Sequence, residues 1–405
     1  MQYDVIVIGS GGAGIMAAIA AAQNGKKVLL LEKLSTIGAK LKASGGGKCN
    51  ITNTLKLNEF LQYFGKNGRF IRDALTTFSS QDLREFLKEI GVPTHAPDGF
   101  RVFPTTHNSS TIIEALLQHL KKLNVEIKTN ISATKILHKT NHVYGVATNQ
   151  EDFFAPNVVI ATGGKGYPML GTTGDGYTLA QECGHTITKL YPAMLPLHTK
   201  EQWVNRLRAN TIAKATLKID LKKYKKLKAV GDLIFTKNGL RGPVILDFAR
   251  EITPLLETHK EIPIVANLTQ GMNENDALEL LKKNSHKTVF ETLTQVVPKE
   301  LATIFCELSN ITLEQKYKQL QGSSKEKLVK LLAWTPLTII GDDGFEKAMV
   351  TRGGVNLKEI DPKTMQSKRI NGLYFCGEVL DIDGACGGYN LQYCFSSGYL
   401  CGVNI

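Results

Sequence analysis

The sequence lacks the features that mark membrane proteins, disulfide-stapled proteins and zinc proteins. No apolar run in its 405 residues approaches the roughly 18 to 20 residues that span a bilayer, so we expect no membrane insertion. The seven cysteines are odd in number and scattered, and no Cys-x-x-Cys occurs. A disulfide framework and a zinc site are therefore not expected, and we predict no metal site.

The amino terminus also lacks the charge pattern of a secretory leader. No Lys or Arg precedes the apolar segment Val5–Ile8, and glycines follow it in a way that suits a tight phosphate-binding turn. We therefore expect a cytoplasmic protein. The length exceeds what one hydrophobic core usually supports, which predicts two or three compact units.

Acidic residues are too few to balance the basic ones, and the formal net charge is +12. The excess is concentrated in places such as Lys214 to Lys228. Nucleic acid, an acidic membrane surface or a phosphorylated cosubstrate would each fit this charge, but a solvated basic face is the simpler interpretation. We therefore do not expect a nucleic-acid partner from charge alone, and nothing in the sequence indicates an oligomeric state.

The first residues form a strand, turn, helix and strand pattern. Tyr3–Ile8 is apolar and β-branched, Ala13–Asn24 favours a helix, and Lys27–Leu31 is a second apolar run. This is the βαβ unit of a parallel sheet, and Val158–Ala161 predicts another short buried strand.

An insertion is predicted from about Ala193, where the pattern of apolar and polar residues changes. Alternating segments such as Ile262–Asn267 indicate a β-rich part over 193–270, and short amphipathic segments, among them Thr312–Leu320, indicate a helical part over 271–335. The predicted fold is α/β. A Rossmann-like nucleotide-binding domain, residues 1–192 and 336–405, is split in sequence by this insertion.

The first chemical motif is a glycine-rich turn directly after the first strand, formed by Gly9, Gly11, Gly12, Ala13 and Gly14. Glycines at this spacing allow a pyrophosphate to approach the backbone at a helix start. An acidic residue, Glu32, follows at the next strand end, where it can accept hydrogen bonds from a ribose. A structural glycine turn is the alternative, but the strand and helix context favours nucleotide binding.

Two further glycine clusters lie far apart in the sequence. The first is Ser44, Gly45, Gly46, Gly47, Lys48, Cys49 and Asn50, which is either a flexible surface loop or backbone brought close to a planar ring or phosphate. Cys49 has no second cysteine nearby, so a packing role is favoured over redox catalysis. The second cluster spans Gly377 to Gln392, where Asp383 can meet a polyol chain and the Gly388-Tyr389-Asn390 amides can face a flavin carbonyl.

Together with Ala161-Thr162-Gly163-Gly164, these segments resemble a bacterial flavoprotein family. Its members are described as NAD(P)/FAD-dependent oxidoreductases, aminoacetone-oxidase-like or bile-acid-inducible-reductase-like. Its FAD domain is similar to those of glutathione reductase and fumarate reductase. The resemblance covers essentially the whole chain and is specific for FAD, but it does not specify a substrate.

The resemblance implies the residues that hold FAD. Gly9 to Gly14, Glu32, Lys33 and Lys40 would hold the adenosine and phosphates, Ser44 to Asn50 and Thr162-Gly163 would approach the flavin, and the carboxy-terminal cluster would close the site. The remaining implied positions are Ala133, Ala161, Gly377, Glu378, Asp383, Gly388, Tyr389, Asn390 and Gln392. Lys48 stands where Arg is expected in many relatives, which puts a bidentate contact there in doubt.

No second complete glycine fingerprint and no redox-active cysteine pair are present. NADH or NADPH, if it is the donor, must therefore dock without a Rossmann unit of its own. No catalytic set is evident, and the candidates are polar residues on loops: Arg101, His107, Tyr167, Arg241 and Arg352. For each of them a structural salt bridge or a solvated side chain is the alternative.

These observations lead to one main hypothesis and one alternative. The main hypothesis is an FAD-dependent oxidoreductase that reduces an activated double bond, or oxidises a small amine or alcohol, with NAD(P)H as the expected donor and the insertion as a substrate cap. An oxygen-using amine oxidase is a variant of it. The alternative is a flavin-carrying protein that binds nucleic acid or is associated with RNA modification.

Overall fold

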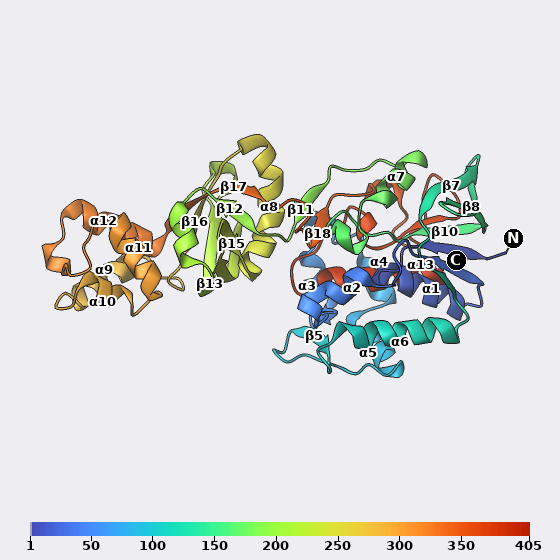
Figure 1. The fold of residues 1–405 in the computed structure, drawn as a ribbon, viewed down its shortest axis with the longest axis horizontal. Coiled ribbons are helices and arrows are strands. Elements are labelled where there is room, and N and C mark those ends of the chain that lie inside the picture. The colour runs from blue at the N-terminus through green and yellow to red at the C-terminus, as the bar shows by residue number, and fades with distance from the viewer. Residues whose placement is uncertain (1) are drawn as a thin grey trace. The chain divides into compact units, whose positions relative to one another are not determined.

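The computed structural model describes residues 2–405 and divides them into two compact units. The first unit contains the residues up to Pro192 and those from Met349 onward, and the second contains Ala193–Ala348. Each unit has its own hydrophobic core. In Figure 1 the first unit combines the blue and red ends of the chain, with β10, α1 and α13 close together, and β1 pairs with β10.

A parallel sheet forms the centre of the first unit. Its strand order is β19 (Leu373–Phe375), β10 (Asn157–Ile160), β1 (Val5–Ile8), β2 (Val28–Leu31) and β6 (Glu126–Lys128). The strands β19, β10, β1 and β2 are mostly apolar and almost completely buried, as expected for a sheet covered on both faces, whereas the edge strand β6 has the sequence Glu-Ile-Lys and is partly exposed.

The register of this sheet determines where the site forms. Ile8 is level with both Leu31 and Ile160, and Ile160 is level with Phe375. Because the strands are parallel, the residues that follow them emerge along one edge of the sheet. Segments that are more than 300 residues apart in the sequence therefore meet there.

Two helices pack unusually closely beside the sheet. A Cβ at Gly398 of α13 (Tyr389–Val403) would lie 2.1 Å from the carbonyl oxygen of Ala13 in α1 (Gly12–Gln23). A Cβ at Gly402 would lie 2.4 Å from that of Ala17. Both pairs advance by four residues in the same direction, so the helices run parallel and only glycine allows this separation.

Smaller elements surround this centre. The helices are α2 (Ala39–Ala43), α3 (Leu57–Gln62), α4 (Arg72–Thr77), α5 (Ser80–Glu89), α6 (Ser109–Lys122) and α7 (Asp175–Glu182). One small sheet has the order β3 (Thr52–Asn53), β5 (Arg101–Pro104) and β4 (Thr94–His95). A second has the order β7 (Ala133–Lys139), β8 (His142–Thr148) and β9 (Phe153–Phe154). In a third, β11 (Tyr191–Ala193) pairs with β18 (Val350–Arg352).

The second unit combines a closed β-barrel with helices. The barrel order is β12 (Leu197–Thr199), β15 (Gly239–Arg241), β14 (Lys228–Phe235), β13 (Thr211–Ile219), β16 (Ile262–Asn267) and β17 (Thr335–Asp342). The helices are α8 (Pro243–His259), α9 (Glu274–Lys283), α10 (Val289–Leu293), α11 (Lys299–Leu308) and α12 (Gly322–Ala333).

Two details of the insertion differ from the sequence-based prediction. The chain returns to the first unit at Met349 and not at residue 336, because β17 pairs with β12 and β16 and closes the barrel. The segment Thr312–Leu320 contains only a short 3-10 turn at Tyr317–Gln319, and Lys316 forms a β-bridge with Thr288. Within residues 2–405, no helix has the length and apolar character needed to cross a membrane.

Candidate cofactor-binding site

The amino-terminal glycines have three different structural roles. Gly9 has a φ of +99°, and a Cβ there would lie 2.7 Å from the carbonyl oxygen of Ala161. A Cβ at Gly14 would lie 1.9 Å from the carbonyl oxygen of Gly9, so this glycine allows α1 to approach β1. A Cβ at Gly11 would meet nothing within 4 Å. Gly11 therefore leaves an open space at the start of α1, which fits a pyrophosphate.

Glu32 lies beside this turn. Its Oε2 accepts a hydrogen bond from the backbone N–H of Ser10 (3.0 Å) and from Ser10 Oγ (2.5 Å), and its Oε1 accepts one from the N–H of Leu34 (2.9 Å). These contacts fix the carboxylate at the strand end. The N–H of Ile131 also donates to the carbonyl of Glu32 (3.0 Å), which brings the segment before Ala133 to the same place.

The second glycine cluster has an ordered left-handed backbone. Gly45, Gly46 and Gly47 have φ values of +58°, +65° and +86°, a run that side chains other than glycine rarely tolerate. A Cβ at Gly46 or Gly47 would meet nothing within 4 Å. We call such backbone bare, because neither a side chain of its own nor a neighbouring residue covers it. This supports the prediction of a backbone surface that a ring or phosphate can approach.

Cys49 is buried in this cluster. Its side chain is 0% exposed, and burial raises the pKa of its thiol to about 11. A thiol with this pKa stays protonated at neutral pH and is a poor nucleophile. The structure thus supports the packing role over a redox role.

The carboxy-terminal cluster approaches both amino-terminal segments. A Cβ at Gly377 would lie 2.7 Å from Ala13 Cβ, and a Cβ at Gly388 would lie 2.4 Å from the carbonyl oxygen of Thr52. The N–H of Gly377 donates to Ser397 Oγ (3.0 Å). Asn390 holds the loop closed, because its Oδ1 accepts from the N–H of Gly384 (2.7 Å).

The two helix starts are offset along a common direction. Gly398 lies beside Ala13, near the start of α1, whereas α13 begins nine residues earlier at Tyr389. At 1.5 Å per residue the start of α13 lies about 13 Å beyond that of α1. Two positive helix ends separated in this way suit an elongated dinucleotide with its pyrophosphate at one and its ring system at the other.

Aromatic rings pack around the start of α13. The Tyr389 ring stacks on Tyr63 at 4.5 Å between centroids and lies 4.8 Å from Phe60. A Cβ at Gly387 would lie 3.2 Å from the Phe100 ring. This end of the site is therefore apolar and glycine-lined, which suits a flat ring system.

Two lysines predicted to contact phosphates lie close to acidic partners. Lys40 Nζ forms an ion pair with Glu378 Oε2 at 2.8 Å, and both side chains are largely buried. Lys33 Nζ pairs with Asp175 and donates to Thr173 Oγ1 at 2.5 Å. The sequence analysis missed Thr173 and Asp175, which lie in the segment that continues from Ala161-Thr162-Gly163.

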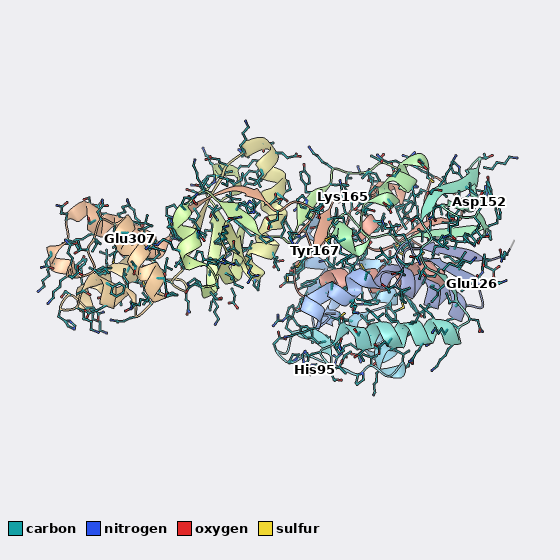
Figure 2. The ribbon with its side chains drawn as sticks, in the orientation of Figure 1. His95, Glu126, Asp152, Lys165, Tyr167 and Glu307 are labelled. Atoms are coloured by element: carbon teal, nitrogen blue, oxygen red, sulfur yellow. The ribbon has the colours of Figure 1, made fainter. Side chains whose placement is uncertain are left out.

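Thr351 connects three parts of the site and was also missed. Its Oγ1 accepts hydrogen bonds from the N–H groups of Lys165 (2.7 Å) and Gly166 (3.2 Å), and its own N–H donates to Glu378 Oε1 (2.8 Å). Lys165 and Tyr167, which lie on one loop, are labelled in Figure 2. Thr162 Oγ1 is buried without a hydrogen-bond partner among the described residues, which leaves it available to a bound molecule.

Gln392 does not join these groups. It is 0% exposed, and its Nε2 donates to the carbonyl of Phe78 (3.2 Å) and to Ser396 Oγ (2.9 Å). The structure therefore gives its side chain a packing role, and the predicted contact with the cofactor is not supported.

The candidate catalytic residues are dispersed. Arg101 is exposed and pairs with Asp98 at 2.6 Å, and His107 is exposed with its Nε2 2.8 Å from that of His95. Arg241 is exposed in the second unit. These positions favour structural or solvated roles.

Tyr167 and Arg352 are the two candidates held next to the site. Tyr167 has a φ of +56° on the Lys165 loop, and Arg352 directly follows Thr351. Burial raises the pKa of the nearby Asp381, to which the Asp383 charge also contributes, while Arg352 acts in the opposite direction. Arg352 is thus within electrostatic reach of a half-buried carboxyl pair.

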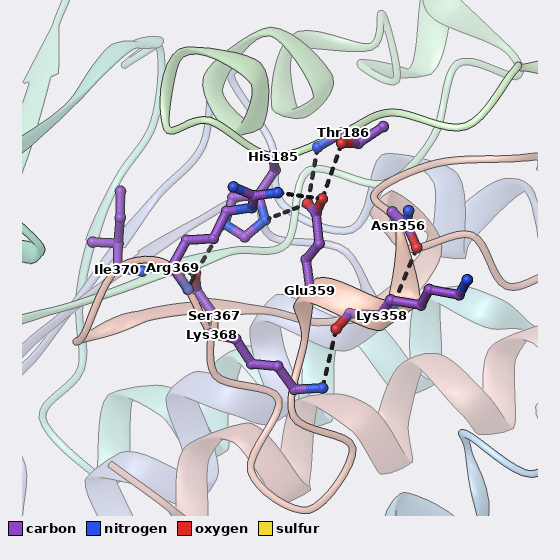
Figure 3. A network of polar contacts seen from close by, with 9 residues as sticks. All are labelled: His185, Thr186, Asn356, Lys358, Glu359, Ser367, Lys368, Arg369 and Ile370. Atoms are coloured by element: carbon purple, nitrogen blue, oxygen red, sulfur yellow. Dashed lines mark hydrogen bonds and ion pairs between the residues drawn. The ribbon is translucent and has the colours of Figure 1, made fainter.

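A serine, histidine and glutamate arrangement elsewhere in the first unit has a structural role (Figure 3). Ser367 Oγ lies 2.9 Å from His185 Nε2, and His185 Nδ1 lies 3.2 Å from Glu359 Oε2. Ser367 Oγ also accepts from the N–H groups of Arg369 and Ile370, each at 3.0 Å, and His185 is buried. A hydroxyl that is buried and accepts hydrogen bonds from two backbone N–H groups is not available as a nucleophile, so this arrangement is not a hydrolase triad.

The family model for the HI0933-like protein Rossmann domain matches residues 3–404. The chain belongs to this family. It is an FAD-dependent oxidoreductase with a Rossmann-type FAD-binding domain and additional β-rich and helical regions, as the resemblance implied.

Two kinds of curated relative match this chain in sequence over almost their full length. The 3-dehydro-bile acid delta(4,6)-reductase of Clostridium scindens is 32% identical over 98% of this chain and 97% of its own. The ribosomal RNA dihydrouridine synthase of Haemophilus influenzae is 29% identical over 100% of this chain and 99% of its own.

Solved structures show the same fold at lower identity. A flavocytochrome c3 fumarate reductase in its open conformation has a TM-score of 0.54 at 20% identity, covering 99% of this chain and 78% of that one. The 3-ketosteroid-delta4-(5alpha)-dehydrogenase of Rhodococcus jostii has a TM-score of 0.53 at 16% identity, covering 99% and 96%.

Proposed function

We propose that this protein reduces a carbon–carbon double bond conjugated to a carbonyl group, with NADH or NADPH as the electron donor. When bound and reduced, FAD supplies a hydride to one carbon of the double bond, and the other carbon takes a proton. The substrate gains two hydrogens and keeps its carbonyl, while the flavin is reoxidised.

The observation that carries this proposal is the chemistry shared by the full-length relatives. One is named as a delta(4,6)-reductase of a 3-dehydro-bile acid, whose double bonds are conjugated to the 3-oxo group. The other is named for making dihydrouridine, which is uridine reduced at the double bond conjugated to its C4 carbonyl. The substrates differ, but the reacting group is the same.

The chain's own residues provide a holding site and one polarising group. The bare backbone at Gly11, Gly46 and Gly47 would hold the dinucleotide. Arg352, next to Thr351 and the Asp381 carboxyl, is the candidate to bind the substrate carbonyl, because a guanidinium donates a fork of hydrogen bonds. Withdrawal of electrons through that carbonyl would make the distant alkene carbon a better hydride acceptor.

Anaerobic stopped-flow spectroscopy tests the donor. NADH or NADPH should bleach the flavin absorption, and an enone such as a 3-oxo-4-ene steroid should restore it. A spectrum that stays oxidised with both nucleotides would contradict the donor assignment. Flavin that is reduced chemically and then not reoxidised by any enone would contradict the reaction.

Variants of Arg352 test the polarising role. Arg352→Ala should slow flavin reoxidation by the enone by about 10²-fold, the loss typical of one transition-state hydrogen-bond donor, while flavin reduction by the nucleotide continues. Arg101→Ala is the matched control, since Arg101 is exposed and paired with Asp98. Equal reoxidation rates in both variants would remove Arg352 from the mechanism.

Uridine in RNA is the second candidate substrate. It is favoured by a basic segment in the second unit, because an RNA carries a dense array of phosphates and a free bile acid does not. Incubation with reduced protein should add two hydrogens to a uridine, measured by mass spectrometry of nuclease digests. Steroid reduction without any RNA product would favour the small-molecule form.

A further inference from the structure

Most of the chain's net positive charge comes from one short stretch of the second unit. From Lys200 to Arg241 the sequence has twelve Lys and Arg but three Asp and Glu, a net charge of +9 out of +12 for the whole chain. This stretch includes β13, β14, β15 and the turn between β13 and β14. The excess is thus concentrated in one part of the barrel.

The densest part is the turn between β13 and β14, which we call the lysine turn. It has five exposed lysines, of which the last is the first residue of β14: Lys222, Lys223, Lys225, Lys226 and Lys228. Within residues 2–405, none of these five forms an ion pair with an acidic side chain. Other basic residues of the second unit do have acidic partners: Lys200 pairs with Glu261, which directly precedes β16, and Arg206 pairs with Glu307 of α11.

Apolar residues hold the lysine turn in a defined shape. Leu221, Tyr224 and Leu227 recur every three residues, are half-buried and pack against the core of the second unit. The N–H of Tyr224 donates to the carbonyl of Leu221, and the N–H of Leu227 donates to that of Tyr224, each at 2.8 Å. The lysines between these anchors therefore project outward from an ordered backbone, and are not part of a loose tail.

Five like charges held close together repel one another, and the only favourable contact that the structure shows for them among residues 2–405 is that of Lys223 Nζ with the Tyr224 ring, at 5.6 Å from its centroid. A polyanion would relieve this repulsion and release its own counterions on binding. We propose that the lysine turn binds the phosphate backbone of RNA. This inference rests on the RNA form of the proposed function, and it assigns backbone docking to the insertion and base chemistry to the flavin site.

Salt-dependent binding tests the proposal. Fluorescence anisotropy with a labelled, uridine-containing RNA hairpin would be measured across KCl concentrations for the wild-type holoprotein and for a variant with all five lysines of the turn changed to Ala. Five phosphate contacts correspond to a slope of log affinity against log salt of about −4 to −5 for a duplex. We expect the variant to lose about this much of the wild-type slope.

A matched control removes the same charge elsewhere. Its five exposed lysines are in the helical part of the second unit: Lys282, Lys283, Lys299, Lys318 and Lys327. The control should keep the wild-type slope. Equal loss of slope in both variants would show a general charge effect and overturn the assignment, as would wild-type binding that does not depend on salt.

Two further measurements separate the possible outcomes. Tighter binding to anionic phosphatidylserine vesicles than to RNA at equal salt would overturn RNA as the partner. Flavin reoxidation by a small uncharged enone should be unchanged in the lysine-turn variant. If no enone reoxidises the flavin but the RNA slope still depends on the lysine turn, the proposed reaction fails and the docking surface stands.

Discussion

The pair of substitutions Gly11→Ala and Gly14→Ala separates cofactor binding from folding. A Cβ at position 14 would lie 1.9 Å from the carbonyl oxygen of Gly9, so α1 would have to move away from β1 by about 1.5 Å to restore normal contact. Overpacking of this kind costs about 3 kcal/mol, and the better helix propensity of Ala returns about 1 kcal/mol. A net loss of about 2 kcal/mol should lower the melting temperature of the FAD-free protein by about 4 to 8 °C.

Gly11→Ala should behave in the opposite way. Its methyl group meets nothing within 4 Å, so the FAD-free protein should lose only the small N-cap preference of Gly over Ala, about 0.5 kcal/mol. The same methyl group would occupy the open space at the start of α1, and FAD affinity should fall at least about tenfold, or 1.4 kcal/mol.

Thermal melts without FAD and fluorescence titration with FAD distinguish the two effects. The reasoning is refuted if Gly11→Ala lowers the FAD-free melting temperature as much as Gly14→Ala does. It is also refuted if Gly11→Ala binds FAD as tightly as the wild type.

Three further predictions concern stability and reactivity. Burial lowers the pKa of His185 below 6.5, so the stability that this residue contributes is lost as the pH falls below that value. For Glu359, burial acts to raise the pKa, but hydrogen bonds from Arg369 and Thr186 outweigh it and lower the pKa to about 2. The stability that Glu359 contributes is therefore lost as the pH falls from about 4.5 toward 2. Urea unfolding from pH 8 to 2 should show both losses, and His185→Gln should flatten the part between pH 7 and 5. An unchanged profile would contradict this account. Gly398→Val should prevent close packing of α1 and α13 and reduce soluble yield, whereas a normal melting temperature would contradict the packing argument. Iodoacetamide should label Cys386 before any other cysteine, because it is the exposed one, and mass mapping of an early time point would reveal any other order.

The parts of the site that follow from local chain geometry could be predicted from the sequence. The glycine turn and Glu32 come directly after buried strands, and the strand ends of a parallel sheet meet at one edge. Three consecutive glycines fit no regular element, which singles out Gly45 to Gly47 as a special backbone segment, and the structure shows three residues with positive φ there. Their contact with the cofactor stays a prediction.

The remaining parts depend on contacts between distant segments. Thr351 was not predicted because its role arises only when β18 lies beside the Lys165 loop. The sequence of β17 predicts a strand but does not indicate which unit the strand belongs to. Only its pairing with β12 and β16 assigns it to the barrel, so the end of the insertion lies later than the sequence predicts. The packing role of Gln392 is likewise invisible in the sequence, since it depends on the carbonyl of Phe78.

The distribution of constraints explains how one fold can serve different substrates. The predicted dinucleotide site combines backbone without side chains and close packing, and an added methyl group at Gly9, Gly14 or Gly377 would clash. Such positions cannot change without loss of the cofactor or the fold. The exposed lysine turn has no packing restraint on its charged ends, so its charge can change at little cost to stability. If the bile acid and RNA reactions of the relatives use the same flavin site, differences in substrate should therefore follow the surface charge of the insertion more closely than the glycine motifs. Substitution of all five lysines of the lysine turn by Glu should then abolish RNA binding, while the flavin remains bound.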